Sequence, residues 1–264
     1  MEAGLNHPIF APVRPFFERL GGLSLDCFNR LAEELGIKTE SGEQVRFVPP
    51  ARSDPYYEVH LFETGQVPTR PGSRHDLFNA LAWFAFPKTK ARINAMHAAQ
   101  IPKESGKRGR LRDMLTIFDE GGAIAVCGDD VAALVRQARW RELFVERHRH
   151  LRIVVLGHAV MEQAALAPHP RITCKVIIAE PGCDLDAHAA EWLSTAGKTP
   201  RDLPPLPVFG YPGWFPGSGQ PGLYSDERCF RTLRRGKMPP GVGQAAAAPQ
   251  GAEESPGSRE RDAG

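Results

Sequence analysis

Apolar residues recur at helical spacing in several parts of the chain. Positions three and four apart in sequence lie on the same face of a helix, so this spacing predicts elements with one buried side. Ser24 is a suitable N-cap for the second part of the first of these regions, and Gly36 ends it. The predicted helices are residues 15–36 in two pieces, 74–85, 87–99, 130–148, a helix that begins near His158, and residues 184–196.

Shorter runs that are uniformly apolar or alternate with polar residues predict strands. The Thr64-Gly65 pair separates two of them and predicts a hairpin over Tyr56–Pro71. A second hairpin is expected over Leu111–Gly128, with its turn at residues 119–122. The predicted strands are residues 45–48, 56–62, 66–69, 115–118, 123–127, 153–156 and 173–178. Strands and helices mix without strict βαβ repetition, which favours an α+β fold with a small mixed or antiparallel sheet.

The segment Arg74–His97 combines large apolar residues with two His, one Asp and two Asn. Burial of such polar side chains is unfavourable unless they are hydrogen-bonded. Ser73 is a good N-cap, and Pro87 suits the first position of a second helix. The segment therefore predicts two helices hinged at Pro87, which carry either a hydrogen-bonded core or a polar site.

Three regions differ in composition. Residues 1–12 are expected to form an irregular N-terminal arm, and residues 13–235 a single α+β domain with a Pro- and aromatic-rich loop region near its end. Residues 236–264 contain no Phe, Trp, Tyr, Leu or Ile. Such a segment buries too little apolar surface to offset the entropy of ordering, so a disordered tail is expected.

Composition and charge exclude some classes of protein. The formal net charge of +2 among 264 residues does not indicate a nucleic-acid or membrane surface, and no apolar run is long enough for a membrane span. The five Cys are scattered and form no CxxC pair, which is typical of free thiols in a reducing compartment. Without a signal-peptide pattern at the N-terminus, we expect a cytoplasmic protein.

Six blocks of sequence occur in a familiar order. They are YYEVHLFETGQVPTR, RHDLFNALAWFAFPKTKARINAMH, LRDMLTIFDEGGAI, VLGHAVMEQ, PLPVFGYPGWFPG and YSDERCFRTLR. Across residues 13–235 the chain resembles an uncharacterised bacterial family, domain of unknown function 3025. One departure is visible, since the Glu-Lys pair usual in that family is Glu162-Gln163 here. The resemblance implies no established activity.

Polar side chains share a face on each helix of the Arg74–His97 segment. His75, Asp76 and Asn79 fall on one side of the first helix. Lys90, Asn94 and His97 share a face of the second and are candidate substrate-binding residues. In a functional interpretation, His75 is a general base or metal ligand and the Asn side chains orient substrate or water. In a structural interpretation, the same residues cap the helix and bind loop backbone.

Two further acidic or His-containing pairs are candidates. Asp119 and Glu120 precede Gly-Gly, where they serve either as ordinary turn residues or as catalytic carboxylates. His158 and Glu162 lie one helical turn apart, a spacing that suits a His–Glu pair or a shared metal. Two His with several carboxylates suit zinc, manganese or iron, and carboxylates alone suit magnesium. The candidate metal ligands are His75, Asp76, His158 and Glu162.

These observations favour a metal-dependent hydrolase with His75, Asn79, Asp119 and Glu120 as catalytic residues. The alternative is a non-catalytic module that binds a phosphorylated ligand, a nucleic acid or a protein. The basic stretch Lys103–Arg112 would suit phosphate groups, although solvated basic loops are commoner. A ββα nuclease motif would need a His on the first hairpin, where only His60 is available. Ser218 lacks a GxSxG context, and the chain has no P-loop or dinucleotide fingerprint.

Overall fold

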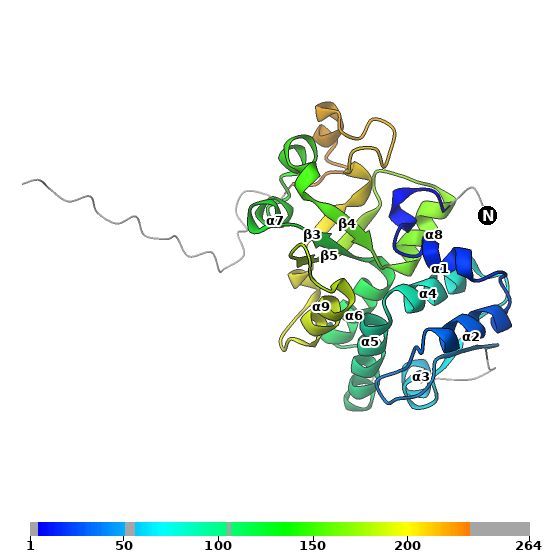
Figure 1. Ribbon diagram of the computed structural model, residues 1–264. Helices are drawn as coiled ribbons and strands as arrows, with labels where there is room; N and C mark the ends of the chain where they lie inside the picture. Colours follow the sequence, from blue (N-terminus) through cyan, green and yellow to red (C-terminus); the bar gives the residue numbers. More distant parts are fainter. Residues whose placement is uncertain (1–4, 51–55, 105–106, 233–264) are drawn as a thin grey trace, which may run out of the picture. The chain divides into compact units, whose positions relative to one another are not determined.

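The computed structural model describes residues 5–50, 56–104 and 107–232, and it confirms the α+β class (Figure 1). The helices are α1 (Arg14–Arg19), α2 (Leu25–Glu34), α3 (Tyr57–Thr64), α4 (Arg74–Ala85), α5 (Pro87–Gln100), α6 (Arg110–Gly121), α7 (Asp129–Arg136), α8 (His158–Leu166) and α9 (Leu185–Ser194). The strands are β1 (Arg46–Val48), β2 (Gln66–Pro68), β3 (Gly122–Val126), β4 (Arg152–Val155), β5 (Thr173–Ala179) and β6 (Pro205–Pro207). The tail predicted for residues 236–264 lies outside the described residues.

The larger sheet has the strand order β4-β3-β5-β6. β3 pairs antiparallel with β4 and parallel with β5, and β6 is antiparallel to β5. Every residue of β3 is buried, as its uninterrupted apolar sequence predicts for a strand covered on both faces. Alternate residues of β3 enter two separate cores, one shared with α5, α6 and α9 and the other with α4, α7 and α8.

The two helices predicted around Pro87 are confirmed as α4 and α5. The Ser73 hydroxyl accepts a hydrogen bond from the Asp76 main-chain N–H at 3.2 Å, which is the predicted N-cap. Helix α4 is buried on most of its sides, Trp83 among its residues, so it is a central helix of the molecule. Pro87 occupies the first position of α5, where its missing N–H costs nothing.

The predicted strand over residues 56–62 and the Tyr56–Pro71 hairpin are wrong. Residues 57–64 form helix α3, which ends where Gly65 adopts a left-handed conformation with φ of 71°. Strand β2 pairs instead with β1, in parallel. The order of apolar and polar residues in this segment fits both the spacing of a helix and the alternation of a strand. Packing against α5 favours the helix.

The predicted hairpin over Leu111–Gly128 is also wrong. Residues 110–121 form helix α6, whose buried Met114, Leu115 and Phe118 have helical spacing. Asp119 and Glu120 therefore lie in the last turn of a helix rather than in a tight turn. The predicted helix over residues 130–148 is interrupted, since α7 ends at Arg136 and Ala138 has a φ of 54°.

Residues 7–10 pack against the rest of the described chain. Pro8–Phe10 forms a short 3₁₀ helix, and the side chains of Ile9 and Phe10 are each 1% exposed. The His7 ring nitrogen Nε2 lies 2.7 Å from the main-chain oxygen of Trp214. No helix in the described part of the chain combines the length and apolar character of a membrane span.

Gly157 joins β4 to α8 at a point of close backbone approach. A Cβ atom at this position would lie 2.6 Å from the Glu120 main-chain oxygen and 2.6 Å from the Gly122 nitrogen. We expect Gly157→Ala to lower the free energy of unfolding by about 1–3 kcal/mol, because the backbone must shift to relieve the overlap. Urea denaturation measures this loss.

Gly121→Ala is the matched control for this prediction. A Cβ at Gly121 would meet only Val160 Cγ2, at 3.8 Å, which is ordinary van der Waals contact. Since Ala favours a helix over Gly, this variant should be as stable as the wild type or more stable by up to ~1 kcal/mol. Equal stabilities of the two variants would contradict the close approach at Gly157.

Candidate functional site

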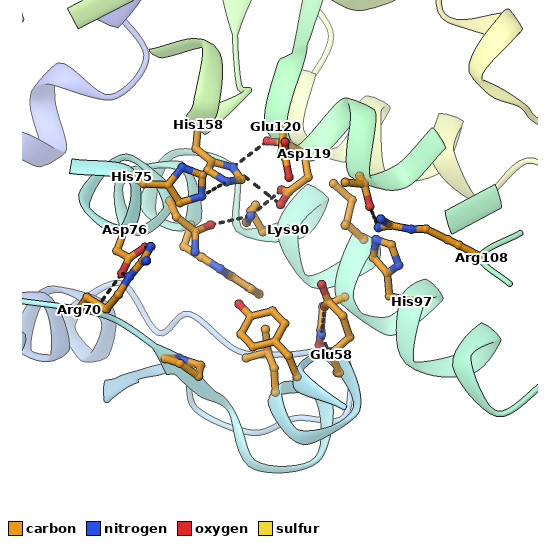
Figure 2. Close-up of a pocket in the computed structure, with 18 residues that line it drawn as sticks. Glu58, Arg70, His75, Asp76, Lys90, His97, Arg108, Asp119, Glu120 and His158 are labelled. Atoms are coloured by element: carbon orange, nitrogen blue, oxygen red, sulfur yellow. Dashed lines mark hydrogen bonds and ion pairs between the residues drawn. The ribbon is translucent and has the colours of Figure 1, made fainter. Parts of the chain in front are cut away.

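A cavity of about 360 Å³ lies where α3, α4, α5, α6 and α8 meet (Figure 2). Nine of the ten candidate residues from the sequence line it: His75, Asp76, Asn79, Lys90, Asn94, His97, Asp119, Glu120 and His158. The tenth, Glu162, contacts His75. The structure thus brings together side chains from three separate segments of the chain.

Two imidazole rings face each other in this cavity. The Nε2 atoms of His75 and His158 are 3.2 Å apart, and their ring centroids are 4.6 Å apart. His75 belongs to the first turn of α4 and His158 begins α8. The His75 side chain is 38% exposed, whereas that of His158 is 6% exposed. His75 is therefore the member of the pair that solvent and ligands can reach.

Hydrogen bonds on the far side of each ring fix where its proton resides. Nδ1 of His158 lies 2.8 Å from the Asp119 main-chain oxygen, and Nδ1 of His75 lies 3.0 Å from Glu162 Oε2. A carbonyl and a carboxylate only accept, so each Nδ1 donates. Both Nε2 atoms then direct a lone pair at the other ring. Two lone pairs that face each other repel. A proton or another cation between the two Nε2 atoms would be attracted by both of them.

His158 is the buried member of the pair, and its surroundings disfavour its charged form. Burial lowers the pKa of His158 to about 4, and the positive charges of Lys90 and His75 act in the same direction. The Asp119 carboxylate, whose Oδ2 is 3.7 Å from His158 Nδ1, opposes this shift without reversing it. His158 is thus a neutral acceptor at neutral pH.

A buried ion pair forms the floor of the site. Lys90 Nζ donates to Asp119 Oδ1 at 2.5 Å and to Asn79 Oδ1 at 2.8 Å, with its side chain 5% exposed. Burial alone would raise the pKa of Asp119, but the charge of Lys90 and its hydrogen bond overcome it and hold the pKa below its usual value. Asp119 therefore stays ionised, and two acceptors of the protein hold the Lys90 ammonium.

Asp76 lines the cavity and accepts three hydrogen bonds from Arg70. Asp76 Oδ2 accepts from the Arg70 main-chain N–H at 2.7 Å and from Nε at 2.8 Å, and Oδ1 accepts from Nη2 at 2.8 Å. Although burial would raise the pKa of Asp76, these bonds with Arg70 hold it below its usual value. The structure thus places Asp76 as an anchor for the segment before α4.

The sequence did not point to two acidic groups of α3 that line the cavity, Tyr57 and Glu58. Burial raises the pKa of Glu58 to about 7 and, with the nearby carboxylates, keeps the pKa of Tyr57 well above its usual value. The strand prediction hid them, because a helix over 57–64 is needed to bring both side chains toward α5.

His97 lies in the cavity wall on α5, 2% exposed. Arg112 Nε donates to its Nδ1 at 3.2 Å, while Arg112 also pairs with Glu104 at 2.7 Å. Burial, reinforced by the Arg112 charge, lowers the pKa of His97 from 6.5 to about 4. Arg112 belongs to the predicted basic stretch Lys103–Arg112, of which residues 105–106 lie outside the described residues.

This pKa predicts acid sensitivity. Between pH 6.5 and pH 4 the unfolded chain binds a proton at His97 that the folded protein does not, so stability falls as the pH falls. The contribution of His97 is about 3 kcal/mol, since one pKa unit corresponds to about 1.4 kcal/mol. In His97→Gln, the loss of unfolding free energy between pH 7 and pH 4.5 should be smaller than in the wild type. Urea denaturation at both values tests this, and equal losses would contradict it.

The predicted metal ligands do not converge on one point. Glu162 lies behind His75, on the Nδ1 side, and Asp76 is held by Arg70. Within residues 5–50, 56–104 and 107–232, no group of three or more His, Cys, Asp or Glu is arranged to hold a metal ion. Of the four predicted ligands, His75 and His158 are the two whose side chains point toward each other, with their Nε2 atoms 3.2 Å apart.

A comparison with protein families gives one match. The model of a family described as a protein of unknown function (DUF3025) matches residues 45–234, which include every residue of the cavity. No curated protein and no solved structure matches the chain.

Proposed function

Because this chain belongs to the DUF3025 family, whose description assigns no activity, we propose a function from the cavity alone. The proposal is acid–base hydrolysis of a small molecule, with His75 as the residue that transfers protons. The observation that carries it is the His75–His158 pair, whose Nε2 atoms face each other at 3.2 Å while both Nδ1 atoms are bonded elsewhere.

The pair suits proton transfer in both directions. When the pair holds no shared proton, His75 Nε2 takes a proton from a water molecule that enters beside His158, and the oxygen of that water then attacks the substrate. The same nitrogen returns that proton to the leaving group. Glu162 stabilises the His75 imidazolium in between, and His158 accepts a hydrogen bond from it. Protonation of both Nε2 atoms is unfavourable, because two imidazolium rings would then face each other with their Nε2 atoms 3.2 Å apart.

Other cavity residues support this chemistry by position and charge. The Asp119 main-chain oxygen orients His158, and its carboxylate neutralises Lys90. Asn79 accepts from Lys90 and thereby connects α4 to the ion pair. Glu120 adds a carboxylate to the cavity lining. These are positioning roles, whereas His75 alone is proposed to touch the reacting atoms.

A metal-dependent form of the hydrolase is the second candidate. Metal-binding His residues usually donate their other ring N–H to a carboxylate or a main-chain carbonyl, as His75 and His158 do. Catalytic zinc sites, however, use three protein ligands, and the described residues supply two. The metal-free form needs no residue beyond the cavity lining and Glu162, whereas the zinc form needs a third ligand.

A substrate panel tests the proposal. Purified protein is assayed with phosphatase, esterase, amidase and nuclease substrates, once with a chelator and once with added zinc, manganese or magnesium. We expect turnover of at least one class in the presence of the chelator. Turnover only with added metal would support the second candidate. Binding without turnover would support the non-catalytic module and contradict the proposal.

A further inference from the structure

A second part of the cavity contains acceptors that lack a donor. Asn94 is 2% exposed, and its amide nitrogen donates to both the main-chain oxygen and Oε2 of Glu58, each at 2.8 Å. Both N–H groups of the amide are thus used. Its Oδ1 atom is buried without a hydrogen-bond partner among the described residues. A buried oxygen left in this way is unfavourable by about 1–3 kcal/mol, which a ligand donor would relieve.

The Glu58 carboxyl group beside Asn94 has no ion pair within the described part of the chain. The two cations that act on it most are engaged elsewhere, Lys90 with Asp119 and Arg112 with Glu104. The hydrogen bond from Asn94 offsets only part of the desolvation of the Glu58 carboxylate. An additional positive charge at this point would therefore stabilise the ionised form.

The charges of the cavity lining favour a cation as well. Arg70 is neutralised by Asp76 and Lys90 by Asp119. Arg108 lies 3.7 Å from Asp113, which is outside the lining. Two carboxyl groups of the lining, Glu58 and Glu120, remain without such a partner in the residues that the structure describes. With Glu58 ionised and the His rings neutral, the lining has four carboxylates against the three cations Arg70, Lys90 and Arg108, so its formal net charge is −1.

From this geometry we infer that Glu58 and Asn94 bind a positively charged N–H donor of the substrate, a primary ammonium or a guanidinium group. This inference rests on the proposed function, because it gives the chemical class of the substrate that the same cavity would hydrolyse. Figure 2 shows Glu58 apart from His75 and His158, on the other side of Lys90. A substrate would therefore place its cationic end at Glu58 and its scissile bond at His75.

Binding of simple probes tests this inference without any assay of turnover. n-Propylamine and methylguanidine are titrated into the ¹⁵N-labelled full chain at pH 8, and n-propanol serves as the uncharged match. We expect saturable shifts of the Asn94 side-chain amide with the two cations, and at least tenfold weaker binding of the alcohol. Below about pH 7 the affinity for n-propylamine should decrease, because Glu58 gains a proton that competes with the ligand.

Variants then assign the site. Glu58→Gln should weaken n-propylamine binding at least tenfold, and Glu63→Gln, an exposed position of the same helix, should leave it unchanged. His75→Gln should also bind n-propylamine normally, since His75 belongs to the other part of the cavity. Amine binding by a protein that hydrolyses nothing would overturn the proposed function and leave this site intact. Equal affinity for n-propanol, or unaltered binding by Glu58→Gln, would overturn the site.

Discussion

Replacing His75 with Gln should lower kcat for hydrolysis by at least about 100-fold, the lower limit of what general acid–base groups contribute. Gln retains an amide that can contact Glu162 but has no nitrogen that exchanges a proton near neutral pH. Because the His75 side chain is 38% exposed, the loss of stability should be small. Steady-state kinetics on the substrate found by the panel measure the loss of rate, and urea denaturation measures the stability.

His150→Gln is the control for this variant, since His150 is exposed and outside the cavity. It should show wild-type kcat. A second readout separates proton transfer from a structural effect of the substitution: His75→Gln should lose kcat while it binds n-propylamine with wild-type affinity. Wild-type activity in His75→Gln would remove this residue from the mechanism.

Loss of the Asp119 carboxylate should be the most destabilising single change in the site. Asp119→Asn leaves the Lys90 ammonium, 5% exposed, without its counter-charge. Removal of one partner of a buried ion pair typically lowers the free energy of unfolding by about 3–5 kcal/mol. The double variant Lys90→Met/Asp119→Leu should recover most of this loss, because no buried charge remains. Equilibrium unfolding in urea measures all three proteins.

A matched control is the ion pair of Lys88, two residues before Lys90 on α5. Lys88 Nζ pairs with Asp184 at 2.6 Å, but both side chains are more than half exposed. Asp184→Asn keeps an N-cap for α9 and removes only a solvated ion pair, so its urea midpoint should stay close to that of the wild type. A midpoint for Asp119→Asn as high as that of Asp184→Asn would show that Lys90 does not depend on Asp119.

The sequence predicted the parts of the molecule in which local signals agree. Ser73 and Pro87 mark the starts of α4 and α5, and the structure has both helices within one residue of the expected bounds. The apolar residues 153–155 of β4 and 176–178 of β5 likewise predicted strands. The candidate site followed from these elements, since His75, Asn94 and His158 were read from helix faces and all line one cavity.

Tertiary contacts decided the rest. Residues 57–64 and 110–121 have apolar positions that fit a strand or a helix, and packing against α5 selects the helix in both cases. The predicted hairpin placed Asp119 in a turn. In the structure Asp119 lies in the last turn of α6, and its main-chain oxygen contacts His158 Nδ1. Asp76 pairs with Arg70, and Lys90 pairs with Asp119. Such pairs depend on distances between side chains, and the spacing of apolar residues in the sequence does not predict these distances.

The contact between His75 and His158 also bears on the order of events in folding. It joins residues 83 positions apart, so it closes a long loop and gains nothing from local helix formation. Helices α4 and α8 can each form before their rings meet. We therefore expect the His75–His158 pair to assemble late, and a fluctuation that detaches α8 would separate the two rings while the cap at Ser73 and helix α4 stay folded.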